Sequence, residues 1–238
     1  MATKLQIIVP VYNEGENIIH TLEEIHAKIN VPNEILIIYD YEQDNTLPAI
    51  KSYIQTNGPD NIKLVKNKFG RGILNALKTG FSSADSETVL VVMADCSDDL
   101  AAVDEMFAKI EEGYDIVCGS RYIKGGEQVG GPIIKKTLSR LAGLSLHYLF
   151  RFPVHDISNS FKMYRKKIID SIKIESQGGF EIGMEIVVKA YFAGYRITEV
   201  PSVWRERAQG ESKFKIWKWL PSYLRWYLYV IKNTIFKR

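Results

Sequence analysis

The sequence predicts an α/β protein in which a mainly parallel sheet is covered by helices on both faces. Short apolar runs rich in Val and Ile alternate along the chain with stretches in which apolar residues recur at helical spacing. Three of these runs end abruptly in acidic or polar residues, at the position where strands of open α/β sheets bind ligands. With 238 residues, 46% hydrophobic and 25% charged, the chain has the size and composition of an ordinary globular protein with a substantial core.

The alternation is strictest in the first half of the chain. Strands are expected at residues 6–11, 34–39, 62–65, 88–93 and 114–119. The helices expected between them are residues 17–29, a helix that begins near Thr46 and Pro48, and residues 71–82 and 100–112. Such alternation is typical of a parallel sheet, because each strand is followed by a helix that returns the chain to the same edge.

The pattern changes after Arg121. Residues 124–132 are rich in glycine and are expected to form a mobile loop. Helices are then expected at residues 135–150 and 180–193, and strands at residues 158–164 and 196–204. No internal repeat or low-complexity linker separates the two halves, so we expect one domain over residues 1–213, followed by a helical tail over residues 214–238.

The tail combines basic and aromatic residues. Seven Lys and Arg residues and no Asp or Glu lie between Lys213 and Arg238, so the remainder carries a net charge of −4 although the whole chain carries +3. The longest uncharged run, residues 226–231, is far shorter than the ~20 residues that span a bilayer. We therefore expect the tail to lie on an anionic membrane surface. The alternative is a terminal helix packed on the domain or at a dimer contact.

The remaining sequence features predict the compartment. The N-terminal residues show no secretory signal peptide, and the two cysteines, Cys96 and Cys118, do not make a disulfide framework. A reducing compartment follows. We expect a cytoplasmic protein that is peripheral at the cytoplasmic face of a membrane, and no nucleic-acid partner.

The most informative stretch is residues 88–99 (TVLVVMADCSDD), a buried apolar strand that breaks into Asp95, Asp98 and Asp99. Clustered carboxylates repel one another unless a cation lies among them, and Mg²⁺ and Mn²⁺ prefer oxygen ligands. The sequence therefore predicts a divalent metal site here. The alternative is a solvated loop that caps the next helix, because Asp is favoured at that position.

Two other strand ends carry polar groups as well. Because successive parallel strands point the same way, the three ends should converge on a nucleotide and metal site. The groups are Tyr12, Asn13 and Glu14 at the first end, Asp40 and Asp44 at the second, and Asp95, Ser97, Asp98 and Asp99 at the third. A dinucleotide site is disfavoured, because the glycines around Arg71 lack the third glycine and the downstream acid of that motif.

These residues together resemble family 2 glycosyltransferases of the GT-A fold, and within that family the dolichol-phosphate mannosyltransferase (polyprenyl-phosphate glycosyltransferase) group. The resemblance extends from about Gln6 to Lys213. The matching motifs, in family order, are residues 9–14 (VPVYNE), Asp40 with residues 44–46 (DNT), residues 94–99 (ADCSDD), residues 119–122 (GSRY) and residues 207–213 (RAQGESK).

The resemblance implies roles on the donor side. The nucleoside pocket would be formed by Pro10, Tyr12, Glu14, Asp40, Ala94 and Asp95. Asp95 would hold the Mg²⁺ or Mn²⁺ ion as the metal-binding Asp of the family's Asp-x-Asp motif. Met93 replaces the first Asp of that motif, so Ser97, Asp98 or Asp99 would supply the missing oxygen.

It also implies roles on the acceptor side. Arg121 would face phosphate, and Arg207, Ser212 and Lys213 match a family loop that closes over the diphosphate and acceptor. Arg and Lys there would neutralise the charge that develops on the leaving group. The residues expected near the acceptor are Lys135 or Lys136, Arg140, Asp156 and Glu185. If the acceptor is a hydroxyl, Asp156, Glu181 or Glu185 could act as its general base, whereas an anionic phosphate needs none.

The predicted function is transfer of a sugar, with inversion, from a GDP- or UDP-linked donor to a lipid phosphate of the polyprenyl (dolichyl) type at a membrane surface. An enzymatic alternative is transfer to a hydroxyl of a polysaccharide or glycolipid. A third possibility, which Met93 keeps open, is a non-catalytic protein that binds nucleotide sugars or lipids.

Overall fold

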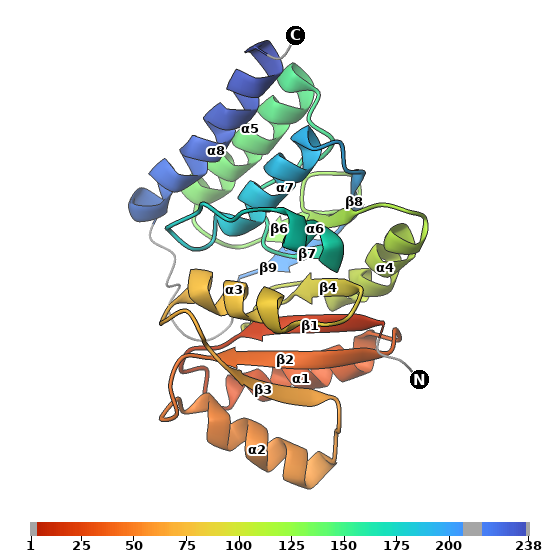
Figure 1. Cartoon of the computed structure of the whole chain (residues 1–238), viewed down its shortest axis with the longest axis vertical. Helices are drawn as coiled ribbons and strands as arrows, with labels where there is room; N and C mark the ends of the chain where they lie inside the picture. The colour runs from red at the N-terminus through yellow and green to blue at the C-terminus, as the bar shows by residue number, and fades with distance from the viewer. Residues whose placement is uncertain (1–3, 207–215, 237–238) are drawn as a thin grey trace.

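The buried apolar runs of the sequence form one seven-stranded sheet. The computed structural model describes residues 4–206 and 216–236, and the strand order of this sheet is β3-β2-β1-β4-β7-β5-β8 (Figure 1). Its strands are β1 (Leu5–Pro10), β2 (Asn33–Tyr39), β3 (Ile62–Lys66), β4 (Thr88–Val91), β5 (Ile116–Ser120), β7 (Lys162–Arg165) and β8 (Ile197–Pro201).

The strand directions confirm a mainly parallel sheet. β1 lies between β2 and β4 and pairs in parallel with both, and β3 and β8 also pair in parallel with their neighbours. β7 is the exception, because it runs antiparallel between β4 and β5. The sequence predicted this strand but held no signal for its direction. As a result, the first residue of β7, not its last, lies next to the carboxyl ends of β4 and β5, close to Asp156.

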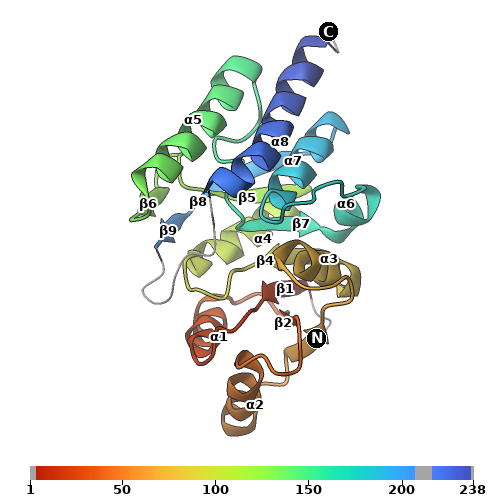
Figure 2. The same ribbon diagram turned by 90° about the vertical axis from the view of Figure 1, so that its left-hand side faces the viewer.

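Helices cover both faces of the sheet, as predicted. On β1, Ile7 and Val9 pack against α1 (Asn17–Lys28) and α4 (Val103–Glu111), whereas Ile8 packs against α3 (Ile73–Ser83). The other helices are α2 (Thr46–Asn57), the 3-10 helix η1 (Leu100–Ala102), α5 (Ile133–Phe150), α6 (Lys166–Ser171), α7 (Ile182–Phe192) and α8 (Ile216–Phe236). Figure 2 shows α5, α7 and α8 gathered at one end of the molecule, away from α1 and α2.

A two-stranded parallel sheet corrects two predictions. β6 (Glu127–Val129) lies within the segment predicted as a mobile loop, and it pairs with β9 (Val203–Arg205). The single strand predicted over residues 196–204 is divided at Ser202, whose backbone N–H donates to the Ser120 carbonyl. A Cβ atom on Gly126 would lie 2.2 Å from that same carbonyl oxygen, so the close approach of these segments requires glycine.

The boundaries of other elements differ slightly from the predicted ones. β4 ends at Val91 rather than at residue 93, so Met93 begins the loop that carries the carboxylates. The predicted helix over residues 100–112 begins as the 3-10 helix η1, in which the Asp99 side chain accepts a hydrogen bond from the Ala101 N–H. The N-cap role considered for this acidic cluster is therefore real for Asp99.

The tail forms a helix, and one of its faces belongs to the core. Trp226 and Val230 are 1% and 0% exposed in the cluster that also holds residues of α3 and α7. The Tyr227 hydroxyl lies 2.9 Å from Ser145 Oγ on α5, and Trp226 Nε1 donates to Ser176 Oγ. This face matches the alternative of a packed terminal helix. In the described ranges, 4–206 and 216–236, no helix has both the length and the apolar content for crossing a bilayer.

The packing of α8 can be tested with two substitutions on the same helix. Val230→Ala removes two buried methyl-sized groups and should lower the free energy of unfolding by about 2 kcal/mol. Leu228→Ala removes more atoms, but Leu228 is 52% exposed, so the change should stay within about 0.5 kcal/mol. Urea denaturation of both variants measures the difference. Equal effects would mean that α8 is not part of the core.

Candidate active site

The ends of β1 and β2 are joined by one buried carboxylate. Asp44, 1% exposed, accepts hydrogen bonds from the backbone N–H groups of Asn13 and Thr46. Thr46 Oγ1 in turn accepts one from the Glu14 N–H. Asn13 has a φ of 53°, a left-handed conformation that Asn tolerates better than most residues. The two strand ends therefore meet, as the sequence predicted, and Asp44 is the residue that holds them.

The nucleoside side of the edge contains an aromatic pair, of which the sequence singled out only Tyr12. The rings of Tyr12 and Tyr41 meet edge to face at 6.0 Å, and the Arg71 guanidinium lies 4.9 Å from the Tyr41 ring centre. Tyr12 is 43% exposed, so its ring remains open to a planar ligand. Asp40 accepts hydrogen bonds from Asn67 Nδ2 at 2.8 Å and from the Gly72 N–H at 2.9 Å, so it also holds the loop before α3.

Three carboxylates follow β4, as predicted, but their surroundings differ. Asp95 is half-buried, and its Oδ1 accepts from the Ser97 N–H at 3.2 Å. Asp98 is buried, and its Oδ2 accepts from the Met93 N–H at 3.1 Å. Cys96 between them has a φ of 54°, and its Sγ lies 3.2 Å from Thr21 Oγ1 on α1. The loop is therefore folded back on itself and tied to α1.

Asp98 is the most perturbed carboxyl group of this cluster. Its burial, together with the nearby charge of Asp95, raises its pKa to about 7. The Met93 N–H, Arg121 and Lys162 act in the opposite direction, but they do not outweigh the burial. The folded protein therefore retains a proton on Asp98 under conditions in which an exposed aspartate has lost it.

This shift predicts how stability depends on pH. Between about pH 4 and pH 7 the folded state holds a proton that the unfolded state has released, so stability falls as the pH rises through this window. Asp98→Asn keeps the acceptor for the Met93 N–H but has no charge to bury. We expect this variant to be stabilised relative to the native sequence by about 1 to 3 kcal/mol more at pH 8 than at pH 5. Urea unfolding in EDTA at both pH values tests this, and a pH-independent difference would contradict it.

A divalent ion fits this loop only in part. Among the described residues, no group of three His, Cys, Asp or Glu side chains is arranged to hold a metal. Asp95 and the adjacent Asp98 can supply carboxylate oxygens, and Mg²⁺ sites often use one or two carboxylates and take their remaining oxygens from substrate phosphates. Asp99 points elsewhere, since its oxygens accept from the N–H groups of Ala101 and Val203. The donor set therefore fits an ion that is completed by a bound diphosphate.

β9 is attached to the same loop. The Arg205 N–H donates to the Ser97 carbonyl at 3.0 Å, and the Val203 N–H donates to Asp99. The end of β9 therefore lies at the edge of the carboxylate cluster. The predicted residues Arg207, Ser212 and Lys213 lie outside the described residues.

Arg121 and Asp156, predicted separately, form one buried ion pair. Arg121 Nε and Nη2 donate to the two carboxylate oxygens of Asp156 at 2.6 and 2.9 Å, and the two side chains are 7% and 0% exposed. Burial alone would raise the pKa of Asp156, but the Arg121 guanidinium outweighs it and holds this pKa below its usual range. Asp156 also accepts from the N–H groups of Arg121 and Asn159.

Polar residues that the sequence did not indicate surround this pair. Arg121 Nη2 also donates to Ser139 Oγ and Ser158 Oγ, both at 3.1 Å, and these two hydroxyls lie 2.6 Å apart. Lys162 is fully buried on β7, where it donates to the Asn159 carbonyl, and burial lowers its pKa. Ser139 and Lys162 lie outside the motifs of the sequence, so only the fold could reveal them.

The remaining predicted acceptor residues have different surroundings. Arg140 is exposed on α5, one position after Ser139, and Lys135 lies 5.8 Å from the ring centre of Trp204. Glu185 is fully buried, and its oxygens accept from the N–H groups of Glu175 and Ser176 and from Lys189 Nζ. This arrangement corrects the prediction of an acceptor role for Glu185, because its carboxylate is committed to holding the loop before α7.

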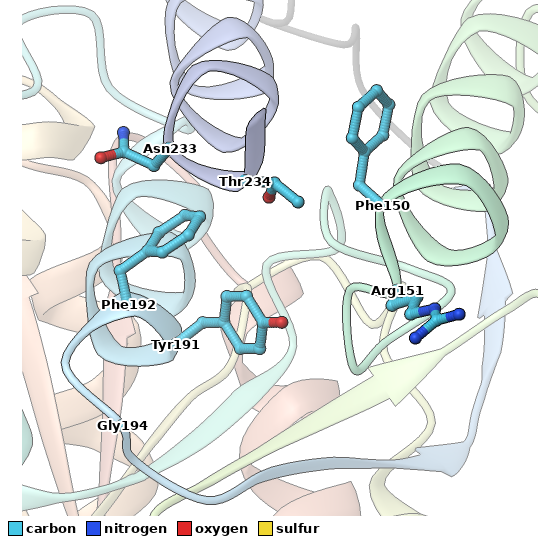
Figure 3. Close-up of a pocket in the computed structure, with 7 residues that line it drawn as sticks. All are labelled: Phe150, Arg151, Tyr191, Phe192, Gly194, Asn233 and Thr234. Carbon is cyan, nitrogen blue, oxygen red and sulfur yellow. The ribbon is translucent and has the colours of Figure 1, made fainter. Parts of the chain in front are cut away.

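A separate pocket of about 430 Å³ lies among the C-terminal ends of α5, α7 and α8 (Figure 3). The side chains of Phe150, Tyr191 and Phe192 form much of its wall, and Figure 3 shows the Tyr191 hydroxyl directed towards the gap beside Arg151. No residue of this pocket was predicted to be functional, and none belongs to the edge where β1, β2 and β4 end.

Solved structures share this fold. Glucosyl-3-phosphoglycerate synthase from Mycobacterium tuberculosis, in complex with Mn²⁺, UDP and phosphoglyceric acid, matches with a TM-score of 0.69 and 14% identity, over 98% of this chain and 78% of the other. The mannosyltransferase PcManGT from Pyrobaculum calidifontis, in complex with GDP-Man and Mn²⁺, matches with a TM-score of 0.69 and 16% identity, over 96% and 64% of the two chains. The predicted GT-A fold is confirmed.

Curated relatives are similar over most of the chain. A dolichol-phosphate mannosyltransferase of Pyrococcus furiosus is 29% identical over 220 residues, which are 89% of this chain. A polyprenol monophosphomannose synthase of Mycolicibacterium smegmatis is 27% identical over 212 residues, 87% of this chain and 79% of the relative. The chain spans 59% of the length of the Pyrococcus protein. The family model for glycosyl transferase family 2 matches residues 6–173, and with that match over most of its length the chain belongs to this family.

Proposed function

We propose that this protein transfers a hexose from a GDP- or UDP-linked donor to a lipid phosphate of the polyprenyl type, with inversion at the anomeric carbon. An oxygen of the acceptor phosphate forms the new bond to that carbon, and the nucleoside diphosphate leaves with the electrons of the old bond. The names of the two curated relatives, a dolichol-phosphate and a polyprenol-phosphate mannosyltransferase, support this acceptor class.

The donor would bind at the edge where β1, β2 and β4 end. Tyr12 offers an exposed ring for the base, and Asp40 offers carboxylate oxygens close by. Asp95, with Asp98 beside it, would hold Mg²⁺ or Mn²⁺ together with the donor diphosphate. A bound ion there neutralises charge on the leaving diphosphate. The Mn²⁺ complexes of the two similar structures support this choice of ion.

One observation carries the choice of a phosphate acceptor over a hydroxyl acceptor. A hydroxyl needs a general base, and the three carboxylates that the sequence offered for that role are all committed. Asp156 is held ionised in its pair with Arg121. Glu181 and Glu185 are buried, where Glu181 accepts from the N–H groups of Gly178 and Gly179 and Glu185 from backbone N–H groups and Lys189. An anionic phosphate oxygen attacks without a base, and the cations around Arg121 and Arg140 suit its charge.

The protein would act at the cytoplasmic face of a membrane, because a polyprenyl phosphate is held in the bilayer. The described part of α8 supports this placement through its exposed apolar residues, Leu224, Leu228 and Ile235, which alternate with the cations Lys218, Arg225 and Lys232 on a helix without acids. The predicted domain division at residue 213 falls in the undescribed segment before this helix.

A screen of donors and acceptors tests the proposal. GDP- and UDP-linked sugars are incubated with a short polyprenyl phosphate, with a glycolipid or with an oligosaccharide, each with and without Mn²⁺. We expect a lipid-phosphate-linked sugar in the first case only, and only with the metal. Transfer to the glycolipid or oligosaccharide instead would establish the hydroxyl reaction, and nucleotide binding without any transfer would indicate a non-catalytic protein.

A further inference from the structure

Lys162 is a buried cation to which the proposed reaction gives no role. It is 0% exposed and lies on β7 in the middle of the sheet, where its backbone pairs with Val91 of β4 and Cys118 of β5. Lysine is almost never fully buried unless its charge is paired, because removing an ammonium group from water is unfavourable. A lysine at this position therefore lowers the stability of the fold, which an apolar residue would not do.

The ammonium group of Lys162 is only partly satisfied. Its Nζ atom donates to the carbonyl oxygen of Asn159, three residues earlier. An ammonium group has three donors, and over residues 4–206 and 216–236 this is the one hydrogen bond that Nζ makes, with no ion pair to a carboxylate. Nζ lies against the first turn of α7, since a Cβ on Gly183 would be 3.8 Å from it. The positive charge of Lys162 is therefore not cancelled by a direct partner.

The Asn159 carbonyl belongs to a turn, residues 156–159, that carries the proposed acceptor-side residues. The Asn159 N–H donates to Asp156 Oδ1 at 3.2 Å. Asp156 and Ser158, which lie on the same turn, both accept hydrogen bonds from the Arg121 guanidinium. Lys162 therefore holds one end of the 156–159 turn, and the Arg121 ion pair is built on the other end.

A buried excess of positive charge at the 156–159 turn comes from Lys162. Arg121 and Asp156 neutralise each other, because they form a bidentate pair at 2.6 and 2.9 Å. Burial acts to raise the pKa of Asp156, and the charges of Arg121 and then Lys162 lower it, so Lys162 is close enough to act on this carboxylate. The other acid whose charge reaches Lys162 is Asp98, on the donor side, where the proposed divalent ion would offset it. An anion beside the pair would therefore meet a net positive charge.

We propose that Lys162 is a positioning residue for the acceptor phosphate, which fixes the 156–159 turn through the Asn159 carbonyl and gives that turn its net positive charge. The inference rests on the proposed function, since it assigns a further residue to the phosphate of that reaction. Lys162 does not touch the phosphate, because its side chain is fully buried. It acts through the turn, and through a charge that a low-dielectric interior screens less than water does.

Three substitutions separate the charge of Lys162 from its volume. Lys162→Met has a similar length and no charge to bury, so this variant should fold. Lys162→Arg keeps the charge. Lys162→Gln keeps an N–H donor for the Asn159 carbonyl but has no charge, and it replaces the methionine variant if that variant does not fold. Met163→Leu is the matched control, because Met163 is equally buried on β7 and its side chain faces the opposite side of the sheet.

Calorimetry with a short polyprenyl phosphate, together with steady-state transfer assays, measures the effect. Lys162→Met and Lys162→Gln should bind the phosphate at least about tenfold more weakly than the native chain, with a similar rise in its KM. The KM for the sugar donor should change by less than about threefold, whereas a general structural defect would weaken donor and acceptor alike. Lys162→Arg and Met163→Leu should both bind the phosphate within about threefold of the native chain.

The same measurements distinguish failure of this inference from failure of the proposed function. If the native chain neither binds the polyprenyl phosphate nor transfers a sugar to it, the proposed function is wrong and the role of Lys162 is wrong with it. If the native chain does both, three results overturn the role of Lys162 alone. They are native phosphate binding by a folded Lys162→Met or Lys162→Gln variant, an equal rise in KM for donor and acceptor, and a folded Lys162→Arg variant that binds the phosphate as weakly as Lys162→Met.

Discussion

Asp95→Asn is expected to lower kcat/KM for sugar transfer by about 10²- to 10³-fold, the size of effect seen when a group that stabilises developing charge is removed. Asp95 is the half-buried carboxylate at the end of β4, and in the proposed reaction it holds the divalent ion at the donor diphosphate. Asparagine keeps the oxygen that accepts the Ser97 N–H, so the loop should retain its shape. The free energy of unfolding should change by less than about 0.5 kcal/mol.

Calorimetry tests whether Asp95→Asn acts by removing a metal ligand rather than by disturbing the fold. GDP and UDP are titrated into the native chain and into the variant, with and without Mn²⁺. The native chain should bind either GDP or UDP more tightly when Mn²⁺ is present. The Asp95→Asn variant should bind that nucleotide equally well with and without Mn²⁺. Asp104→Asn is the matched control, because Asp104 is an aspartate on α4 that binds Asn30, away from this edge. Equally strong nucleotide binding with and without Mn²⁺ in the native chain would contradict the role of Asp95.

The sequence predicted the strand ends of the proposed donor side well because their signals are local. A buried apolar run followed at once by Asp95 marks a strand end, and parallel pairing of β1 with β2 and β4 follows from the alternation with helices. Even here the details depended on tertiary contacts. Asp44 lies close to the end of β2 in sequence, and it joins this end to Asn13 at the end of β1, 31 residues away. No sequence pattern distinguishes such a buried carboxylate from an exposed one.

The proposed acceptor side was less predictable because its residues meet through the antiparallel strand β7. Asp156 and Arg121 are 35 residues apart, and their pairing depends on β7 entering the sheet between β4 and β5. For Glu185 the sequence did not show which way the side chain faces. An acidic residue in the first turn of a helix can face a substrate or the interior of the protein. The Glu185 carboxylate faces the interior, where it accepts from the backbone N–H groups of residues 175 and 176.

The exposed surface was the hardest to predict. The tail was predicted to lie on a membrane because its tryptophans and cations are close together in sequence, yet Trp226 is buried. α5 has an ordinary apolar pattern, and its unusual feature is which residues of that pattern face outwards. A periodic apolar pattern identifies the helix, but it does not show whether the whole apolar surface is covered by the rest of the chain.

Asp156→Ala is expected to lower the free energy of unfolding by about 3 to 5 kcal/mol, because it leaves the Arg121 guanidinium buried without its partner. The pKa of Asp156 is depressed in the folded state, so the contribution of the pair is present above about pH 4 and is lost as the pH falls through that lowered pKa. Urea denaturation at pH 7 and pH 3 measures both effects. The single variant should differ less from the native chain at pH 3 than at pH 7, by up to about 1 kcal/mol, because pH 3 lies less than one unit below the ordinary pKa of an aspartate.

The double variant Arg121→Met/Asp156→Leu separates packing from chemistry. Replacing both charges with apolar side chains of similar volume removes the unpaired ion, so most of the stability lost in Asp156→Ala should return. If the pair also positions the acceptor phosphate, this stable variant should still lose transfer by at least about tenfold, mainly through a higher KM for the lipid phosphate, because a binding contact has been removed. A variant that is stable and transfers at the native rate would limit the pair to a structural role. Ser139 and Ser158, whose hydroxyls both accept from the Arg121 guanidinium, would then have no role in binding the lipid phosphate.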